Sequence, residues 1–240
     1  MSICLIVKFE TVEPVGGSWY RVPMCSNYRA PTDLNRIRLH FGVAMDAVSH
    51  APEVWPQYTG VAIRRADAVE HRREGFTGQF GLLPHWAKDP TLSRRTYNAR
   101  TETVAEKPSF RDAWRKGQRC IIPADWIYEP CYDTGKAVRW KIARADGAPM
   151  GLAGLWSRWW AANGAEVMTF TMLTIAAQGH DLMQRFHKPE DEKRMVVVLD
   201  EADHDRWLDS PVDVASTLLA PFPAGQLVAE AAPLPPRSRV

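Results

Sequence analysis

Short runs of strand-forming residues, rather than long helical periods, most limit how this 240-residue chain can fold. Seven such runs are predicted to form strands. They lie at residues 60–63, 78–83, 119–122, 127–129, 138–142, 167–175 and 194–199. The runs do not alternate regularly with helical segments, which argues against a parallel β-α-β sheet. We therefore predict an α+β fold.

Helices are predicted at three places only. The first covers residues 33–41 with Thr32 as its N-cap, because its apolar residues recur at helical spacing. The second covers residues 109–116, and the third begins near Asp200, whose side chain is expected to cap it with Asp203 at the capping-box position. The tail from residue 220 holds five of the 18 prolines and is predicted to be extended.

Composition excludes several classes of protein. Hydrophobic residues make up 45% of the chain, enough for a core, but no stretch approaches the roughly 18 apolar residues of a membrane span. Phosphate-loop, nucleophile-elbow and H-E-x-x-H motifs are absent, and the four cysteines (Cys4, Cys25, Cys120 and Cys131) have no metal-binding spacing. We expect a cytoplasmic protein with reduced cysteines, no cofactor and no metal.

The Met24-Cys25 pair offers a distinctive chemistry. If Cys25 is the first residue of the working protein, its α-amine and thiol form a 1,2-aminothiol, which can close a thiazolidine ring on an aldehyde. If Cys25 is internal, its nitrogen belongs to an amide and only the thiol can react. A buried cysteine that acts as a small apolar residue is the ordinary alternative.

Polar residues among the predicted strands are the other candidates for chemistry. Asn98, Arg100 and Glu102 lie in the sequence NARTE, Glu129 ends the segment IIPADWIYE, and His187 precedes RMVVVL. Asn98 alone would be a turn or capping residue, and a single histidine is more often structural. A carboxylate after three bulky residues either turns to water or is buried, and burial would raise its pKa toward neutrality, where it could transfer protons.

Five segments together resemble the SRAP family, the SOS-response-associated peptidases, which process abasic sites. They are MCSNYRAP, FGLLPHWAKDP, NARTETVAEKPSFRDAW, RCIIPADWIYE and FHKPEDEKRMVVVL, and they occur in the order found in the family. The resemblance implies a single domain on a mostly antiparallel, barrel-like sheet with flanking helices. It also implies a protein, expected to be monomeric, that crosslinks to abasic sites in single-stranded DNA.

The resemblance assigns a role to four residues. Cys25 matches the cysteine that attacks the ring-opened aldehyde once the preceding methionine is removed. Asn98 matches an active-site asparagine that hydrogen-bonds the sugar or the amine, and Glu129 matches a glutamate that moves protons. His187 matches a histidine that serves as acid or base in opening the sugar.

Basic and aromatic residues near Asn98 supply a candidate DNA-binding surface. The net charge is only +2, so any such surface must be local. We predict phosphate contacts from Arg94, Arg95, Arg100 and Arg119, and base stacking by Trp86.

The start of the chain departs from the family pattern. Members begin at the methionine before their cysteine, whereas here residues 1–23 precede Met24 and form an extension to a domain of residues 24–240. Three explanations stay open: translation starts at Met24, the leader is removed, or Cys25 works as an internal residue. Two other functions also stay open, namely a thiol peptidase that uses Cys25 and a non-catalytic module that binds single-stranded DNA.

Overall fold

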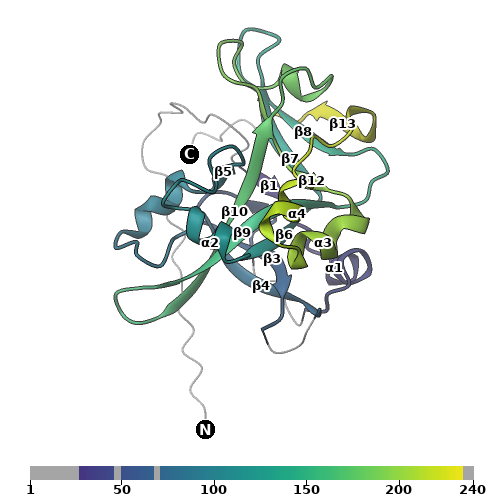
Figure 1. Cartoon of the computed structure of the whole chain (residues 1–240). Coiled ribbons are helices and arrows are strands. Elements are labelled where there is room, and N and C mark those ends of the chain that lie inside the picture. Colours follow the sequence, from purple (N-terminus) through teal and green to yellow (C-terminus); the bar gives the residue numbers. More distant parts are fainter. Residues whose placement is uncertain (1–26, 46–49, 68–70, 235–240) are drawn as a thin grey trace, which may run out of the picture.

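A closed barrel of five strands forms the centre of the computed structural model, which describes residues 27–45, 50–67 and 71–234 (Figure 1). Around the ring, β10 pairs with β4, β4 with β3, β3 with β6, β6 with β9, and β9 with β10 again. β4 and β10 run parallel and the other four pairs antiparallel. The strands are β3 (Thr59–Arg65), β4 (Arg73–Phe80), β6 (Arg119–Ala124), β9 (Met150–Trp160) and β10 (Glu166–Ala176). The predicted α+β fold and barrel-like sheet are confirmed.

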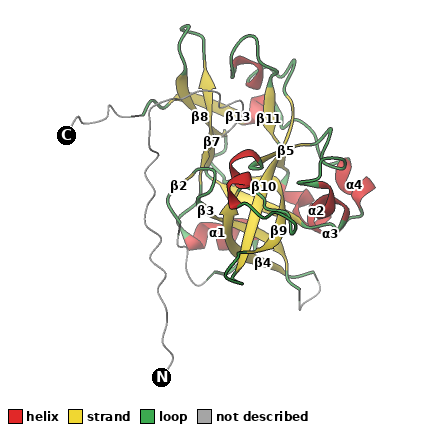
Figure 2. Cartoon of the chain, turned by 90° about the vertical axis from the view of Figure 1, so that its left-hand side faces the viewer, coloured by secondary structure: helices red, strands yellow, loops and turns green. Residues whose placement is uncertain are grey.

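A second sheet stands above the barrel, as Figures 1 and 2 both show for β7, β8 and β13. Its order is β13-β8-β7-β1-β2. The strands are β13 (Leu227–Ala231), β8 (Val138–Arg144), β7 (Trp126–Cys131), β1 (Asn27–Arg29) and β2 (Glu53–Val54). β13 lies within the tail that was predicted to be extended. Three short strands attach to the barrel: β5 (Asn98–Arg100) and β11 (Arg194–Val196) to β10, and β12 (Val198–Leu199) to β9.

Short helices cover the barrel. α1 (Leu34–Phe41) buries Ile37 and Phe41 as its apolar spacing predicts, and it ends at Gly42, where φ is 69°. The N-cap is Asp33 rather than the predicted Thr32, since the Asp33 side chain accepts a hydrogen bond from the Asn35 N–H. α2 (Arg111–Arg115) is shorter than predicted.

The third predicted helix exists, but its predicted cap was wrong. A 3-10 turn, η3 (Glu201–Asp203), precedes α3 (His204–Asp209), and Asp200 makes no side-chain capping hydrogen bond. Burial of Trp207, and not a side-chain cap, therefore stabilises this helix. The sequence did not predict α4 (Val212–Ser216) or the other 3-10 turns, η1 (Pro90–Arg95), η2 (Met183–Arg185) and η4 (Ala224–Gln226). No helix in the described ranges is long and apolar enough to cross a membrane.

Every predicted strand has somewhat different bounds in the structure, and two of the differences have a clear physical reason. The run predicted at 78–83 begins earlier, as β4, and ends before Gly81, whose φ of 121° turns the chain away. The run predicted at 194–199 divides at Val197, because β11 pairs with β10 whereas β12 pairs with β9.

β9, which was not predicted, is a long barrel strand whose glycines resemble breakers in the sequence. A Cβ on Gly151 would lie 2.5 Å from His204 Nε2, and one on Gly154 would lie 2.7 Å from the Thr171 carbonyl oxygen. These glycines therefore permit close approach of neighbouring elements, a reason that only the tertiary structure supplies.

Candidate functional site

Glu129 is the most deeply buried of the predicted catalytic residues that the structure describes, with 1% of its surface exposed. It lies on β7 between β1 and β8, where it is opposite Trp140, while its neighbour Tyr128 is opposite Asn27. The side chain therefore points into protein rather than water, which is the alternative that favours a role in proton transfer.

His187 lies beside Glu129. The preceding residue, Phe186, bridges to Cys131 on β7, and the His187 N–H donates to the Pro130 carbonyl at 2.9 Å. These contacts place His187 Nε2 3.7 Å from Glu129 Oε2. His187 itself has a φ of 68°, a left-handed conformation that costs a non-glycine residue energy and is common at functional sites.

The surroundings of His187 favour its neutral form. Burial lowers the pKa of its imidazole, against a smaller opposing effect of its hydrogen bond to the Arg194 carbonyl. That hydrogen bond joins Nε2 to the Arg194 oxygen at 3.1 Å. Because a carbonyl can only accept, Nε2 carries the proton and Nδ1 keeps the lone pair. The neutral ring is thus a base through Nδ1, next to a buried carboxyl group.

Asn98 and Arg100 lie on the barrel side of the structure, on a short strand beside β10. They are the first and last residues of β5, where they pair with Met172 and Thr174 of β10. Side chains two residues apart on a strand point to the same face, so Asn98 and Arg100 lie on one side while Ala99 is fully buried on the other.

Arg194 connects the β5 region to His187. It is 1% exposed, and its guanidinium donates to both carboxylate oxygens of Glu102, at 3.1 and 2.8 Å, and to the Thr174 carbonyl at 2.7 Å. Although partial burial opposes the effect, the Arg194 guanidinium lowers the pKa of Glu102. Because the Arg194 carbonyl also accepts the His187 Nε2–H, these contacts of buried Arg194 help to fix the orientation of the imidazole.

The predicted DNA-contacting residues divide into two groups. Arg94, Arg95, Arg100 and Trp86 are exposed, with Trp86 at 46%, and Arg94 Nε donates to Gln57 at 2.8 Å. Arg119 is 4% exposed and donates to the carbonyls of Trp207 and Ser210. Its side chain therefore holds α3 against the barrel, and we remove Arg119 from the DNA-contacting set.

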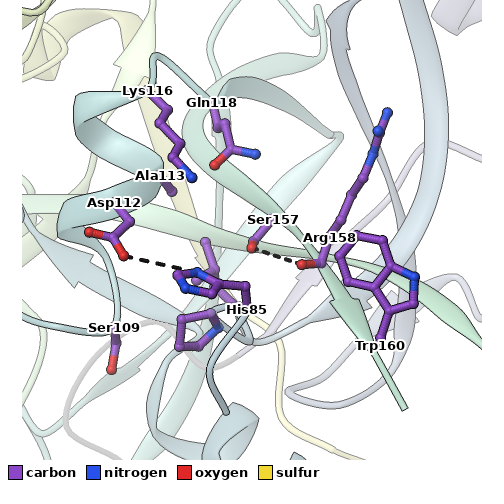
Figure 3. Close-up of a pocket in the computed structure, with 11 residues that line it drawn as sticks. His85, Ser109, Asp112, Ala113, Lys116, Gln118, Ser157, Arg158 and Trp160 are labelled. Atoms are coloured by element: carbon purple, nitrogen blue, oxygen red, sulfur yellow. Dashed lines mark hydrogen bonds and ion pairs between the residues drawn. The ribbon is translucent and has the colours of Figure 1, made fainter. Parts of the chain in front are cut away.

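A cavity of about 200 Å³ opens elsewhere, between α2, β9 and the segment after β4 (Figure 3). It contains no predicted catalytic residue. Asp112 Oδ2 lies 4.0 Å from His85 Nδ1, and Figure 3 shows the Arg158 guanidinium directed away from the cavity.

Cys25, Met24 and the extension of residues 1–23 lie outside the described residues. In the sequence, Cys25 precedes Asn27, the first residue of β1, by two residues.

Comparison with known sequences identifies the family of the chain. A sequence profile of the SOS response associated peptidase (SRAP) family matches residues 24–233. The chain belongs to the SRAP family. Asn98, Glu129 and His187 all lie within the matched region, as does Cys25.

Individual relatives agree with the family assignment. "Abasic site processing protein YoqW" of Bacillus subtilis is 34% identical over 155 residues, which cover 63% of this chain and 66% of that protein. "Abasic site processing protein HMCES" of Xenopus tropicalis is 28% identical over 60% of this chain and 47% of its own length. The chain therefore spans just under two thirds of the first relative and about half of the second.

Solved structures extend the similarity to the fold. A crystal structure of a protein from Bordetella bronchiseptica is 41% identical, has a TM-score of 0.81, and covers 88% of this chain and 100% of that one. One from Bacteroides thetaiotaomicron, 22% identical with a TM-score of 0.74, shares the fold.

Two residues of this candidate site were missed in the sequence. Arg194 and Glu192 make site contacts, yet Arg194 was taken only as the start of a strand. The sequence did contain a signal for Arg194. An arginine at the start of an apolar strand needs polar partners if it is buried. Among the described residues, no group of three or more His, Cys, Asp and Glu could hold a metal ion.

Proposed function

We propose that this protein senses abasic sites in single-stranded DNA and bonds to them covalently through Cys25 as an N-terminal residue. The α-amine and thiol of Cys25 would form a thiazolidine with the ring-opened sugar aldehyde and so shield the lesion during the DNA-damage (SOS) response. We further propose that it works as a cytoplasmic monomer without cofactor or metal. Relatives named abasic site processing proteins support the substrate.

One observation carries the proposal: the buried Glu129–His187 pair lies against the strand that begins two residues after Cys25. Asn27 pairs with Tyr128, the residue before Glu129. Because Cys25 precedes Asn27 by two residues in the sequence, we infer that its aminothiol acts beside this carboxyl group. Proximity of this kind converts an encounter in solution into a local reaction.

The proposed reaction needs proton transfer but no redox step. The Cys25 amine adds to the aldehyde C1′ to give a carbinolamine, and a protonated Glu129 gives its proton to the hydroxyl, which leaves as water. The resulting iminium carbon accepts the thiol sulfur, while the Glu129 carboxylate takes the thiol proton. One C–N and one C–S bond form, one water is lost, and Glu129 ends as it began.

His187, Asn98 and the exposed cations would prepare the substrate. Neutral His187 can accept a proton through Nδ1 as the sugar ring opens, because Nε2 is committed to the Arg194 carbonyl. Asn98 would hydrogen-bond the sugar, whereas Arg94, Arg95 and Arg100 would bind phosphates and Trp86 would stack on a base.

The test uses protein that begins at Cys25 and a labelled single-stranded oligonucleotide with one abasic site. We expect a product that survives denaturing electrophoresis and a mass increase equal to the DNA minus one water. Cys25→Ala keeps the amine and removes the thiol, while protein that retains Met24 keeps the thiol and removes the amine. Both should give no stable product, and equal product from either would refute the thiazolidine.

A peptidase that uses Cys25 is the second candidate, because the family profile carries that name. It predicts that full-length protein is cleaved before Cys25 and that Cys25→Ala abolishes the cleavage. A non-catalytic module predicts DNA binding that is indifferent both to abasic sites and to Cys25→Ala. Each outcome differs from that expected for crosslinking.

A further inference from the structure

Glu192 joins two arginines, Arg100 of β5 and Arg194 of β11. Its Oε2 lies 2.8 Å from Arg100 Nη1, and its Oε1 lies 2.7 Å from Arg194 Nη1. One carboxylate is thus held on each oxygen by a different guanidinium, the arrangement in which arginines bind a phosphate. Glu192 comes from the segment between His187 and β11, and its side chain is 49% exposed.

Within the ion-paired group of Arg100, Arg194, Glu102 and Glu192, the charge is balanced only because of Glu192. Arg100 and Arg194 together carry +2, and Glu102 and Glu192 carry −2. If Glu192 leaves, Arg194 keeps its bidentate contact with Glu102. The three remaining side chains then carry a charge of +1. This charge is accessible to solvent at Arg100, whose side chain is 47% exposed. A DNA phosphate is an anion of suitable charge and geometry for that site.

We propose that Glu192 is a competing carboxylate, which occupies the phosphate position at Arg100 and must be displaced before a DNA strand can bind there. The inference rests on the proposed function, and it concerns how that function is regulated. Glu192 therefore lowers the reversible affinity for every single strand, damaged or not.

Weaker reversible binding favours selectivity in a protein that traps its target covalently. Undamaged DNA is released sooner when the reversible affinity is low, since differences in affinity are expressed mainly in the dissociation rate. An abasic site that reacts during its residence is retained by the covalent bond. Glu192 thus makes retention depend more on the lesion and less on the phosphate backbone.

The test compares Glu192→Gln with Glu190→Gln, in protein that begins at Cys25. Both changes remove one negative charge from the same segment, but in the described part of the chain Glu190 makes no ion pair. On undamaged single-stranded DNA at low salt, Glu192→Gln should bind about fivefold more tightly, which is near the upper value of one exposed ion pair such as Arg100–Glu192. Glu190→Gln should bind nearly as the wild type does, and the gain should shrink as salt screens the charges.

A double variant tests the route through Arg100. If Glu192 acts by occupying Arg100, the Glu192→Gln gain should largely disappear in an Arg100→Gln background. Equal or weaker binding by Glu192→Gln, or an equal gain from Glu190→Gln, overturns the proposal. If the wild type crosslinks but Glu192→Gln does not bind undamaged DNA more tightly, only the proposed role of Glu192 is refuted. If no variant crosslinks, the proposed function is refuted instead. Melting curves check that Glu192→Gln is folded.

Discussion

Gly154 is the residue whose substitution should link the packing of the barrel to the site. It lies on β9 opposite Met172 of β10, and on the other side of β10 Met172 pairs with Asn98 of β5. A Cβ at position 154 would meet three atoms: Thr171 O at 2.7 Å, Ile122 Cδ1 at 2.8 Å and Cys120 Sγ at 2.9 Å. Gly154→Ala therefore presses on the strand that positions Asn98.

The magnitude follows from these distances. Ordinary contact begins at 3.4 Å, so the Thr171 carbonyl must move by 3.4 − 2.7, about 0.7 Å. A strand oxygen cannot move alone, which puts the cost near the upper end of the roughly 1–3 kcal/mol found for overpacked cores. Alanine returns about 0.4–1 kcal/mol by restricting the unfolded chain. The net loss is about 2 kcal/mol, or a melting temperature lowered by about 4–8 °C for a domain of this size.

The assay is thermal unfolding of Gly154→Ala beside a matched control, Gly225→Ala. A Cβ at Gly225 would meet nothing within 4 Å, so that variant should melt at or slightly above the wild-type temperature. We also expect slower crosslinking by folded Gly154→Ala, because Asn98 moves with β10. Wild-type stability in Gly154→Ala would refute the argument that β9 glycines exist for close approach.

Three further predictions concern single side chains. Burial, with a smaller effect of the Arg73 charge, lowers the pKa of His204 to about 3, so the native state binds fewer protons than the unfolded chain and stability falls as pH drops below about 6.5. Denaturant titrations should show a loss of about 2 kcal/mol in the free energy of unfolding between pH 6.5 and 5. His204→Phe should reduce this dependence of stability on pH. Glu129→Gln should slow crosslinking by about 100-fold or more with little change in affinity for undamaged DNA, and an unchanged rate would exclude Glu129 from proton transfer. Arg119→Met should lower the melting temperature yet leave DNA affinity within about twofold, whereas a selective loss of affinity would restore Arg119 to the DNA-contacting set.

The sequence predicted the elements with clear patterns and missed those that depend on neighbours. The apolar face of α1 and the hydrophobic runs of β6, β7 and β10 were recognisable because burial imposes periodicity on residues close in the chain. β9 was missed because its glycines look like strand breakers in the sequence. Their role is to allow close approach of residues that are distant in the sequence. The prediction that Asp200 caps the third helix was wrong for a related reason, because packing of Trp207 stabilises that helix.

The site shows the same division. The residue types and their order were enough to predict the family, which the family profile confirms. They also made Glu129, His187 and Cys25 the candidate residues for chemistry. Only the tertiary structure decided that Arg119 is buried and that Glu192 joins two arginines. The physical reason is that the sequence gives the type of a charged side chain but not whether it faces water, a carbonyl or another charge. Its role depends on long-range neighbours that folding brings within a few ångströms.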